Sequence, residues 1–385
     1  MSLFPAKFRK LLGHVAFLIV GLAVGGIAGY FIGGCMDAVG DRYPDMPLTV
    51  AFVLLTAIVI AAFFLQLIIH EAGHLVFGLL SGYRFSSFRI GSFLWLKENG
   101  KLRCKRLTVA GTGGQCLMAP PELVDGKIPV TLYNLGGALL NLITAALFLL
   151  LHVLTAALPL FSMFCMSMAV MGVATGLTNG IPLHTPTLDN DGYNALSLRK
   201  DPKAVAAFWT QMKVNEATTA GLRLKDMPEE WFALPDDKDM KNSIIAAIAV
   251  FACNRLMDEH RFAEAEELMR KYIKMDSAII GLHYRLMTCD RIFLSLIGVI
   301  DEEKADYLLD KQQRKFMRSM KSFPSIIRTE YAYALLKEGD KDAAQKFADA
   351  FAACAKTYPY PGDIQSEREL MELAESIDKE RKNGI

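Results

Sequence analysis

The sequence predicts an α-helical membrane protein with four transmembrane helices and a small β-hairpin, followed by an all-α, helical-repeat-like cytoplasmic domain. Three observations predict this class. The long apolar runs are confined to residues 1–183, whereas residues 195–385 carry most of the charge. The whole chain is unusually apolar for its length, with 52% hydrophobic residues and a mean hydropathy of +0.26. The charged half has the pattern of one helix after another.

The composition also divides the chain and excludes some function classes. We expect a transmembrane domain over 1–196, a juxtamembrane helical linker over 197–240 and a helical domain over 241–385. A net charge of +1 argues against a nucleic-acid binder, which would carry a basic stripe. The seven cysteines are scattered without a CxxC pair, which is typical of thiols in a reducing compartment rather than of disulfides.

Four apolar segments are long enough to cross a bilayer, which needs about 20 apolar residues. The first has an alternative interpretation, since basic residues before an apolar run also open secretory signal peptides. Its length and the lack of an A-x-A cleavage site favour a membrane anchor. The four segments are 14–34, 48 to about 80, 130 to about 158, and 161 to about 183.

The placement of Lys and Arg predicts the orientation. The loop 35–47 carries Arg42 and three Asp residues, whereas the loop between the second and third segments carries eight Lys and Arg residues. Because basic loops stay in the cytoplasm, we expect a multi-pass protein of the cell membrane with both termini cytoplasmic. His70 then lies roughly 33 Å from the outer end of its segment, near the cytoplasmic side.

The long basic loop predicts a β-hairpin over 85–110, since the Asn-Gly pair in "ENGK" is a strong turn signal. Phe88, Phe93 and Trp95 would sit at the bilayer interface, with basic residues facing lipid head groups. The alternative is a solvated hairpin without a membrane role. The Gly- and Pro-rich stretch 111–121 is expected to break regular structure.

The carboxy-terminal half predicts eight helical spans. Two stretches of it, 247–273 and 329–359, each combine a small apolar helix, a polar turn and an Ala-rich helix. They resemble tetratricopeptide helix hairpins, which implies a surface for a protein partner. An irregular α-bundle is the alternative. The segment 224–235 either gates the membrane site or docks the tail as a plain linker. The expected spans are 202–218, 241–258, 261–274, 278–297, 301–320, 325–337, 341–357 and 364–382.

The motif "HEAGH" places ionisable groups in the second apolar segment. His70 and His74 are four residues apart, so both rings lie on one face of a helix and can hold one metal ion. Glu71 lies beside them, where it can take a proton from a metal-bound water. Such a pattern arises by chance in somewhat under ~1% of chains of this composition. Ionisable groups in a membrane segment mark function by default.

A second motif carries a resemblance to a known family. The fourth segment ends with Asn179, Pro182 and the pair Asp191–Gly192, a pattern similar to that of the site-2 proteases, zinc metalloproteases that cut within the membrane. The resemblance implies that Zn²⁺ is held by His70, His74 and Asp191, with Glu71 as the general base. It also implies substrate contacts for Asn179 and for the G-x-x-x-N patch of Gly137 and Asn141, with Asn141 donating to the substrate strand or the oxyanion.

Several alternatives stay open. Asp189 precedes Asp191 and competes with it as the third ligand, although the Gly after Asp191 matches the family pattern. The predicted activity is endopeptidase cleavage of a membrane-anchored regulator or a signal-peptide remnant, with the lipid bilayer and a tail-bound protein as further partners. An inactive scaffold that binds transmembrane clients, or a metal-handling membrane protein, are the competing functions; the latter usually shows repeated halves, which are not evident here.

Overall fold

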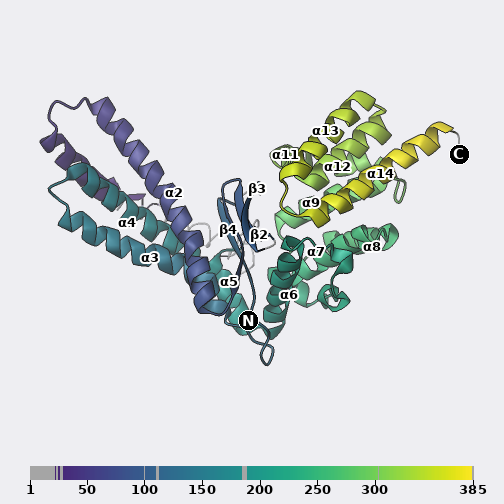
Figure 1. Cartoon of the computed structure of the whole chain (residues 1–385), viewed down its shortest axis with the longest axis horizontal. Coiled ribbons are helices and arrows are strands. Elements are labelled where there is room, and N and C mark those ends of the chain that lie inside the picture. Colours follow the sequence, from purple (N-terminus) through teal and green to yellow (C-terminus); the bar gives the residue numbers. More distant parts are fainter. Residues whose placement is uncertain are drawn as a thin grey trace. The chain divides into compact units, whose positions relative to one another are not determined.

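The computed structural model of the chain describes residues 22, 25–26, 29–98, 100–109, 112–183, 189–301 and 303–383. They are mostly helical and form two compact units (Figure 1). The first unit comprises the chain up to Gly73 together with Gly136–Ile181, and the second comprises His74–Leu135 together with Pro182–Ile385. Each unit is described by itself.

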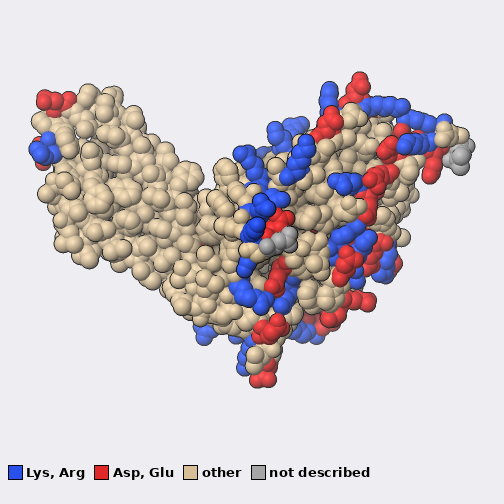
Figure 2. Space-filling view, in the orientation of Figure 1, with Lys and Arg blue, Asp and Glu red and all other residues tan. Residues whose placement is uncertain are grey.

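Three helices of the described residues are long and apolar enough to cross a bilayer: α2 (Leu48–Leu80), α3 (Val130–Leu154) and α4 (Pro159–Gly180). They confirm the second, third and fourth expected segments as helices of spanning length. The first expected segment, 14–34, lies largely outside the described residues; the helix that the structure does describe there covers 29–42. The visible surface over these helices carries few charged side chains apart from a group near one end (Figure 2).

Helix α2 has an apolar exposed side and a buried polar stripe. Phe52, Phe63 and Phe64 are each exposed by half or more, a state that lipid favours and water does not. Every fourth residue on the opposite side is buried, because a four-residue step returns to the same face of a helix. This buried stripe consists of Ala62, Gln66, His70 and His74.

Glycines let the helices of the first unit approach closely. A Cβ atom on Gly73 of α2 would lie 2.3 Å from the carbonyl oxygen of Gly136 and 2.7 Å from Cα of Gly137, both in α3. Gly172 in α4 is packed against α3 in the same way, since its Cβ would lie 2.9 Å from the Asn141 carbonyl. The absence of side chains at these positions lets backbone pack on backbone, as is common between membrane helices.

The second unit contains a four-stranded antiparallel sheet with strand order β3-β2-β1-β4. The predicted turn joins β2 to β3, and Gly100 adopts the left-handed conformation there with φ +78°. The predicted hairpin was incomplete, because Gly91 (φ +57°) divides its first run into two paired strands. The strands are β1 (Arg84–Ile90), β2 (Phe93–Glu98), β3 (Lys101–Arg106) and β4 (Gly114–Ala119).

The expectation that 111–121 lacks regular structure was wrong, since β4 lies within it. Strand β4 pairs with β1, and Cys116 and Met118 point into a buried cluster that includes Tyr83 and Tyr133. Pairing with a neighbouring strand and burial of alternate side chains outweigh the unfavourable flanking Gly and Pro residues.

The two faces of the sheet have different surroundings. Leu94 and Leu96 are 1% exposed and pack against a cluster of the carboxy-terminal helices. Phe88 and Phe93 lie on the opposite face with Trp95, because Phe88 pairs with Trp95 in register and Phe93 lies two residues before it. Phe93 is 46% exposed, and its contact with lipid remains a prediction. The tail residues of this cluster include Ile327, Phe351, Tyr358, Ile364 and Met371.

The remainder of the second unit is helical, close to the predicted spans. The expected helix 301–320 is divided, because Asp310 caps the start of a new helix by accepting a hydrogen bond from the Gln313 amide. A regular repeat in this tail remains a prediction. The helices are α5 (Asp191–Lys200), α6 (Pro202–Thr219), α7 (Ser243–Asp258), α8 (Phe262–Lys274), α9 (Gly281–Leu296), α10 (Glu303–Leu308), α11 (Lys311–Ser319), α12 (Pro324–Ala332) with a π-helical turn over Tyr333–Glu338, α13 (Lys341–Thr357) and α14 (Pro361–Asn383).

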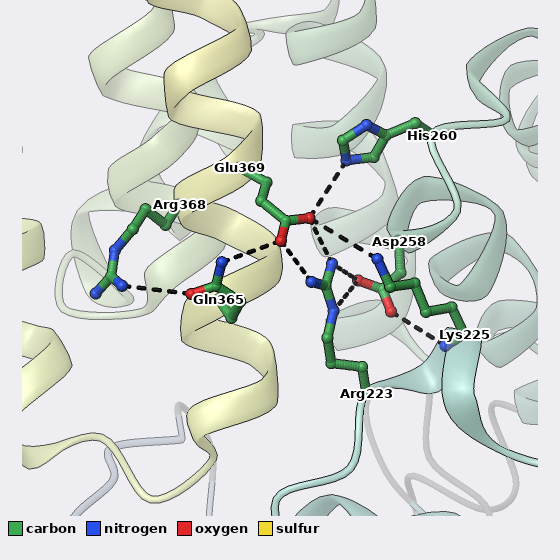
Figure 3. A network of polar contacts seen from close by, with 7 residues as sticks. All are labelled: Arg223, Lys225, Asp258, His260, Gln365, Arg368 and Glu369. Atoms are coloured by element: carbon green, nitrogen blue, oxygen red, sulfur yellow. Dashed lines mark hydrogen bonds and ion pairs between the residues drawn. The ribbon is translucent and has the colours of Figure 1, made fainter.

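Arg223, just after α6, joins distant parts of the tail (Figure 3). Its guanidinium donates to Asp258 at the end of α7 (2.6 Å) and to Glu369 in α14 (2.6 and 2.8 Å). These charge-assisted bonds lower the pKa of Glu369 to about 2. Met227 and Phe232 of the following segment are buried against α6 and α7. These contacts match the docking-linker interpretation of 224–235, whereas the gating role remains a prediction.

Candidate metal centre

The candidate centre begins on the buried stripe of α2. His70 and His74 lie one helical turn apart and are 6% and 8% exposed, and Glu71 is 7% exposed. Three ionisable groups are therefore buried in a helix that otherwise exposes apolar side chains. Burying such groups is costly unless each has a partner or a bound ion.

Asp191 is positioned by a helix cap. The side chain of Asn190 accepts hydrogen bonds from the amides of Tyr193 and Leu183, both at 2.9 Å, so that helix α5 begins at Asp191. This cap holds the Asp191 carboxylate in the first turn, where Oδ2 lies 3.4 Å from His74 Nε2. A carboxylate is also favourable there because the amino end of a helix attracts negative charge.

His70, His74 and Asp191 each offer one ligand atom, and these three atoms all lie within 4.8 Å of one another. Helix α2 is continuous between the two histidines, so their separation is set by one helical turn. A tetrahedral zinc site with bonds near 2.0–2.1 Å has ligand atoms about 3.3 Å apart. The group therefore needs only a modest contraction to bind such an ion.

The hydrogen bond of His74 determines the tautomer of its ring, and with it whether the nitrogen that faces Asp191 has a lone pair. His74 Nδ1 lies 2.9 Å from the carbonyl oxygen of Tyr133, which can only accept. Nδ1 therefore carries a hydrogen, and in the neutral ring Nε2 has a lone pair. This lone pair faces a carboxylate oxygen at 3.4 Å, an arrangement that a cation between the two atoms stabilises. The residues present thus fit a divalent metal ion.

His70 is supported from α3 by a side chain. Its Nδ1 lies 2.8 Å from Asn141 Oδ1, and Asn141 is fully buried. The Asn141 amide nitrogen lies 2.9 Å from the main-chain oxygen and 2.7 Å from the side-chain oxygen of Gln66. The resemblance implied that Asn141 donates to the substrate or the oxyanion. In the structure both amide hydrogens point to Gln66, and Asn141 lies behind His70; its contact with substrate remains a prediction.

Two other predicted substrate residues do not join this group. Gly137 lies against Gly73, where it lets α2 and α3 approach. Asn179 donates from its side chain to the carbonyl of Thr175 one turn earlier in α4, at 3.0 Å. A substrate contact for either residue remains a prediction.

The geometry distinguishes the two candidate aspartates. Ser243, at the start of α7, donates its hydroxyl to Asp189, whereas Asp191 is the carboxylate beside His74. Asp191 is also the one that belongs to the group of three. His184 lies outside the described residues. His152 of α3 is hydrogen-bonded to the hydroxyl of Ser162 in α4 at 2.7 Å.

Sequence reasoning did not identify Gln66, the Tyr133 carbonyl or Asn190 as parts of the centre. Gln66 did leave a signal, because it is the only amide side chain between Leu48 and Ile69 and lies one turn before His70. Asn190 also fits the preferred residue type for a helix cap. The Tyr133 main-chain carbonyl left no signal in the sequence, since every residue has a main-chain carbonyl.

Comparisons of the chain with protein-family models, with curated proteins and with solved structures found no match. The family resemblance therefore rests on the motifs of the chain and on the geometry of the residues they contain.

Proposed function

We propose that the protein is an intramembrane zinc metalloendopeptidase of the site-2 protease type. Its substrates would be membrane-anchored proteins or signal-peptide remnants, cleaved in or near their transmembrane segments. The observation that carries the proposal is the convergence of His70, His74 and Asp191, which come from two helices far apart in the sequence. Their chemistry is that of a catalytic zinc site, which uses three protein ligands and leaves one position open.

Each residue of the centre has a distinct task in the proposed reaction. His70, His74 and Asp191 would hold the ion, which when bound would supply Lewis-acid activation of water and of the scissile carbonyl. Glu71 is buried beside the ligands, where its carboxylate takes a proton from the attacking water and delivers it to the leaving amine. A substrate helix must unwind locally, because its carbonyls are otherwise occupied by its own hydrogen bonds.

The proposal includes an orientation and a role for the tail. The basic loop between α2 and α3 favours a multi-pass protein of the cell membrane with cytoplasmic termini. Water then reaches the centre from the cytoplasmic side. The helical tail would bind a protein partner that selects or regulates substrates.

The decisive experiment compares wild type with Glu71→Gln in the full-length chain. The substitution keeps the shape of residue 71 and removes its ability to accept a proton. We expect cleavage to stop, single-pass proteins to accumulate in the membrane proteome, and about one zinc per chain to remain bound in both proteins. The inactive-scaffold alternative predicts identical proteomes. Continued cleavage by Glu71→Gln, or wild-type protein without bound metal, would refute the proposed mechanism.

A further inference from the structure

We infer that Gln66 and Asn141 are positioning residues that fix the tautomer and the ring orientation of His70, so that metal affinity depends on two side chains that do not touch the metal. The inference rests on the proposed metal centre. All of its contacts lie between α2, α3 and α4 in one compact unit.

The chain of hydrogen bonds starts at a main-chain carbonyl of α4. The carbonyl oxygen of Met168 lies 2.9 Å from the side-chain nitrogen of Gln66. A carbonyl oxygen accepts and never donates, so the amide group of Gln66 must turn its nitrogen toward Met168. The side-chain oxygen of Gln66 is thereby directed at Asn141.

A second main-chain carbonyl fixes Asn141 independently. The carbonyl oxygen of Gln66 lies 2.9 Å from the Asn141 amide nitrogen, and the side-chain oxygen of Gln66 lies 2.7 Å from the same nitrogen. Both neighbours are acceptors, so both hydrogens of the Asn141 amide point to Gln66. The Asn141 oxygen consequently faces His70.

The tautomer of His70 follows from this orientation. Asn141 Oδ1 carries no hydrogen, so the 2.8 Å contact requires that His70 Nδ1 donate. In the neutral ring this tautomer places the lone pair on Nε2, the form that can coordinate a cation, as in His74. A histidine ligand whose other nitrogen is held in this way binds metal more strongly, because its tautomer and ring direction are already set.

The two histidines differ in how their acceptors can be altered. The acceptor of His74 is the main-chain oxygen of Tyr133, which a substitution does not remove. The acceptor of His70 is a side chain, itself held by Gln66, and both are fully buried. Substitutions at 66 and 141 should therefore disturb His70 and leave His74 as an internal reference.

The test uses the purified full-length chain in detergent with two variants, Asn141→Leu and Gln66→Met, which keep the approximate side-chain size. Ser167→Ala is the matched control, since Ser167 is equally buried and polar and precedes Met168 in α4. Zinc affinity is measured by competition with a chelator. We expect Asn141→Leu to weaken zinc binding by about 10–100-fold and Gln66→Met by about 10-fold, with Ser167→Ala unchanged.

A second readout separates positioning from a general loss of structure. In the metal-free chain labelled with 15N-histidine, the nitrogen shifts report which ring nitrogen carries the hydrogen. Wild-type His70 should be protonated at Nδ1, and Asn141→Leu should shift it toward Nε2 while His74 stays the same. Zinc affinities within twofold of wild type, or an unaltered His70 tautomer in Asn141→Leu, would overturn the inference. Wild-type protein that binds no zinc would refute the proposed function. The tautomer measurement would still decide whether Asn141 and Gln66 position His70.

Discussion

The substitution Gly73→Ala tests whether the close contact of α2 and α3 sets the geometry of the proposed metal centre. The added Cβ would lie 2.3 Å from the Gly136 carbonyl oxygen, whereas ordinary contact begins near 3.4 Å. The two backbones must therefore separate by up to about 1.1 Å. Both histidines reach across this contact to α3, at 2.8 Å to Asn141 and 2.9 Å to Tyr133. The same displacement would stretch these bonds to about 4 Å, beyond hydrogen-bonding distance.

We expect Gly73→Ala to weaken zinc binding by about 10–100-fold or more, since losing a single supporting partner has an effect of that size. Cleavage should fall in parallel. Chelator competition on the purified chain measures the affinity. Gly33→Ala is the control, since Gly33 lies in the helix over 29–42 and its added Cβ would meet nothing within 4 Å. If Gly73→Ala binds zinc like wild type while remaining folded, the glycine contact does not set the ligand geometry.

Three further predictions concern the third ligand and the tail. Asp191→Asn should abolish zinc binding while Asp189→Asn retains it, as measured by metal content; the reverse result would exchange their roles. Arg223→Ala should lower the thermal midpoint by about 6–12 °C, because the Asp258 carboxylate, only 4% exposed, loses the guanidinium that balances its charge. Lys241→Ala breaks an exposed ion pair and should lower the midpoint by less than about 2 °C; equal shifts in the two variants would contradict this. Burial, followed by neighbouring carboxylates, raises the pKa of Asp363 to about 7, so tail stability should fall as pH rises from 5.5 to 8. Asp363→Asn should flatten that dependence in pH-resolved melting curves, and an unchanged slope would contradict the assignment.

The helical framework was largely predictable because its signals are local. The boundaries of α2 coincide with the apolar run from Leu48 to Leu80, and most tail helices begin within three residues of their predicted starts. Strand β4 was missed because its stability comes from pairing with β1, which lies 24 or more residues earlier in the chain. Local composition around Gly113 and Pro120 does not reveal a partner that distant.

The three residues of the candidate metal centre were predictable from the sequence, whereas the residues that support them were not. His70 and His74 follow from helical spacing alone, and Asp191 follows from the second motif. The hydrogen-bond partners of Asn141 depend on the distance between α2 and α3, which the contact of Gly73 with Gly136 sets. The sequence shows where the glycines are, but it does not show which of them lie in contact in the folded protein.

The packing of the carboxy-terminal helices on Leu94 and Leu96 has a practical consequence for anyone dissecting this chain. A chain truncated near residue 240 would lack the helices that cover one face of the sheet. The apolar side chains on that face would then be exposed to water, which promotes aggregation. Lost activity in such a fragment would report injury to the sheet, and could be mistaken for the removal of a regulator. Point substitutions on the outer helices are the cleaner way to test the proposed role of the tail.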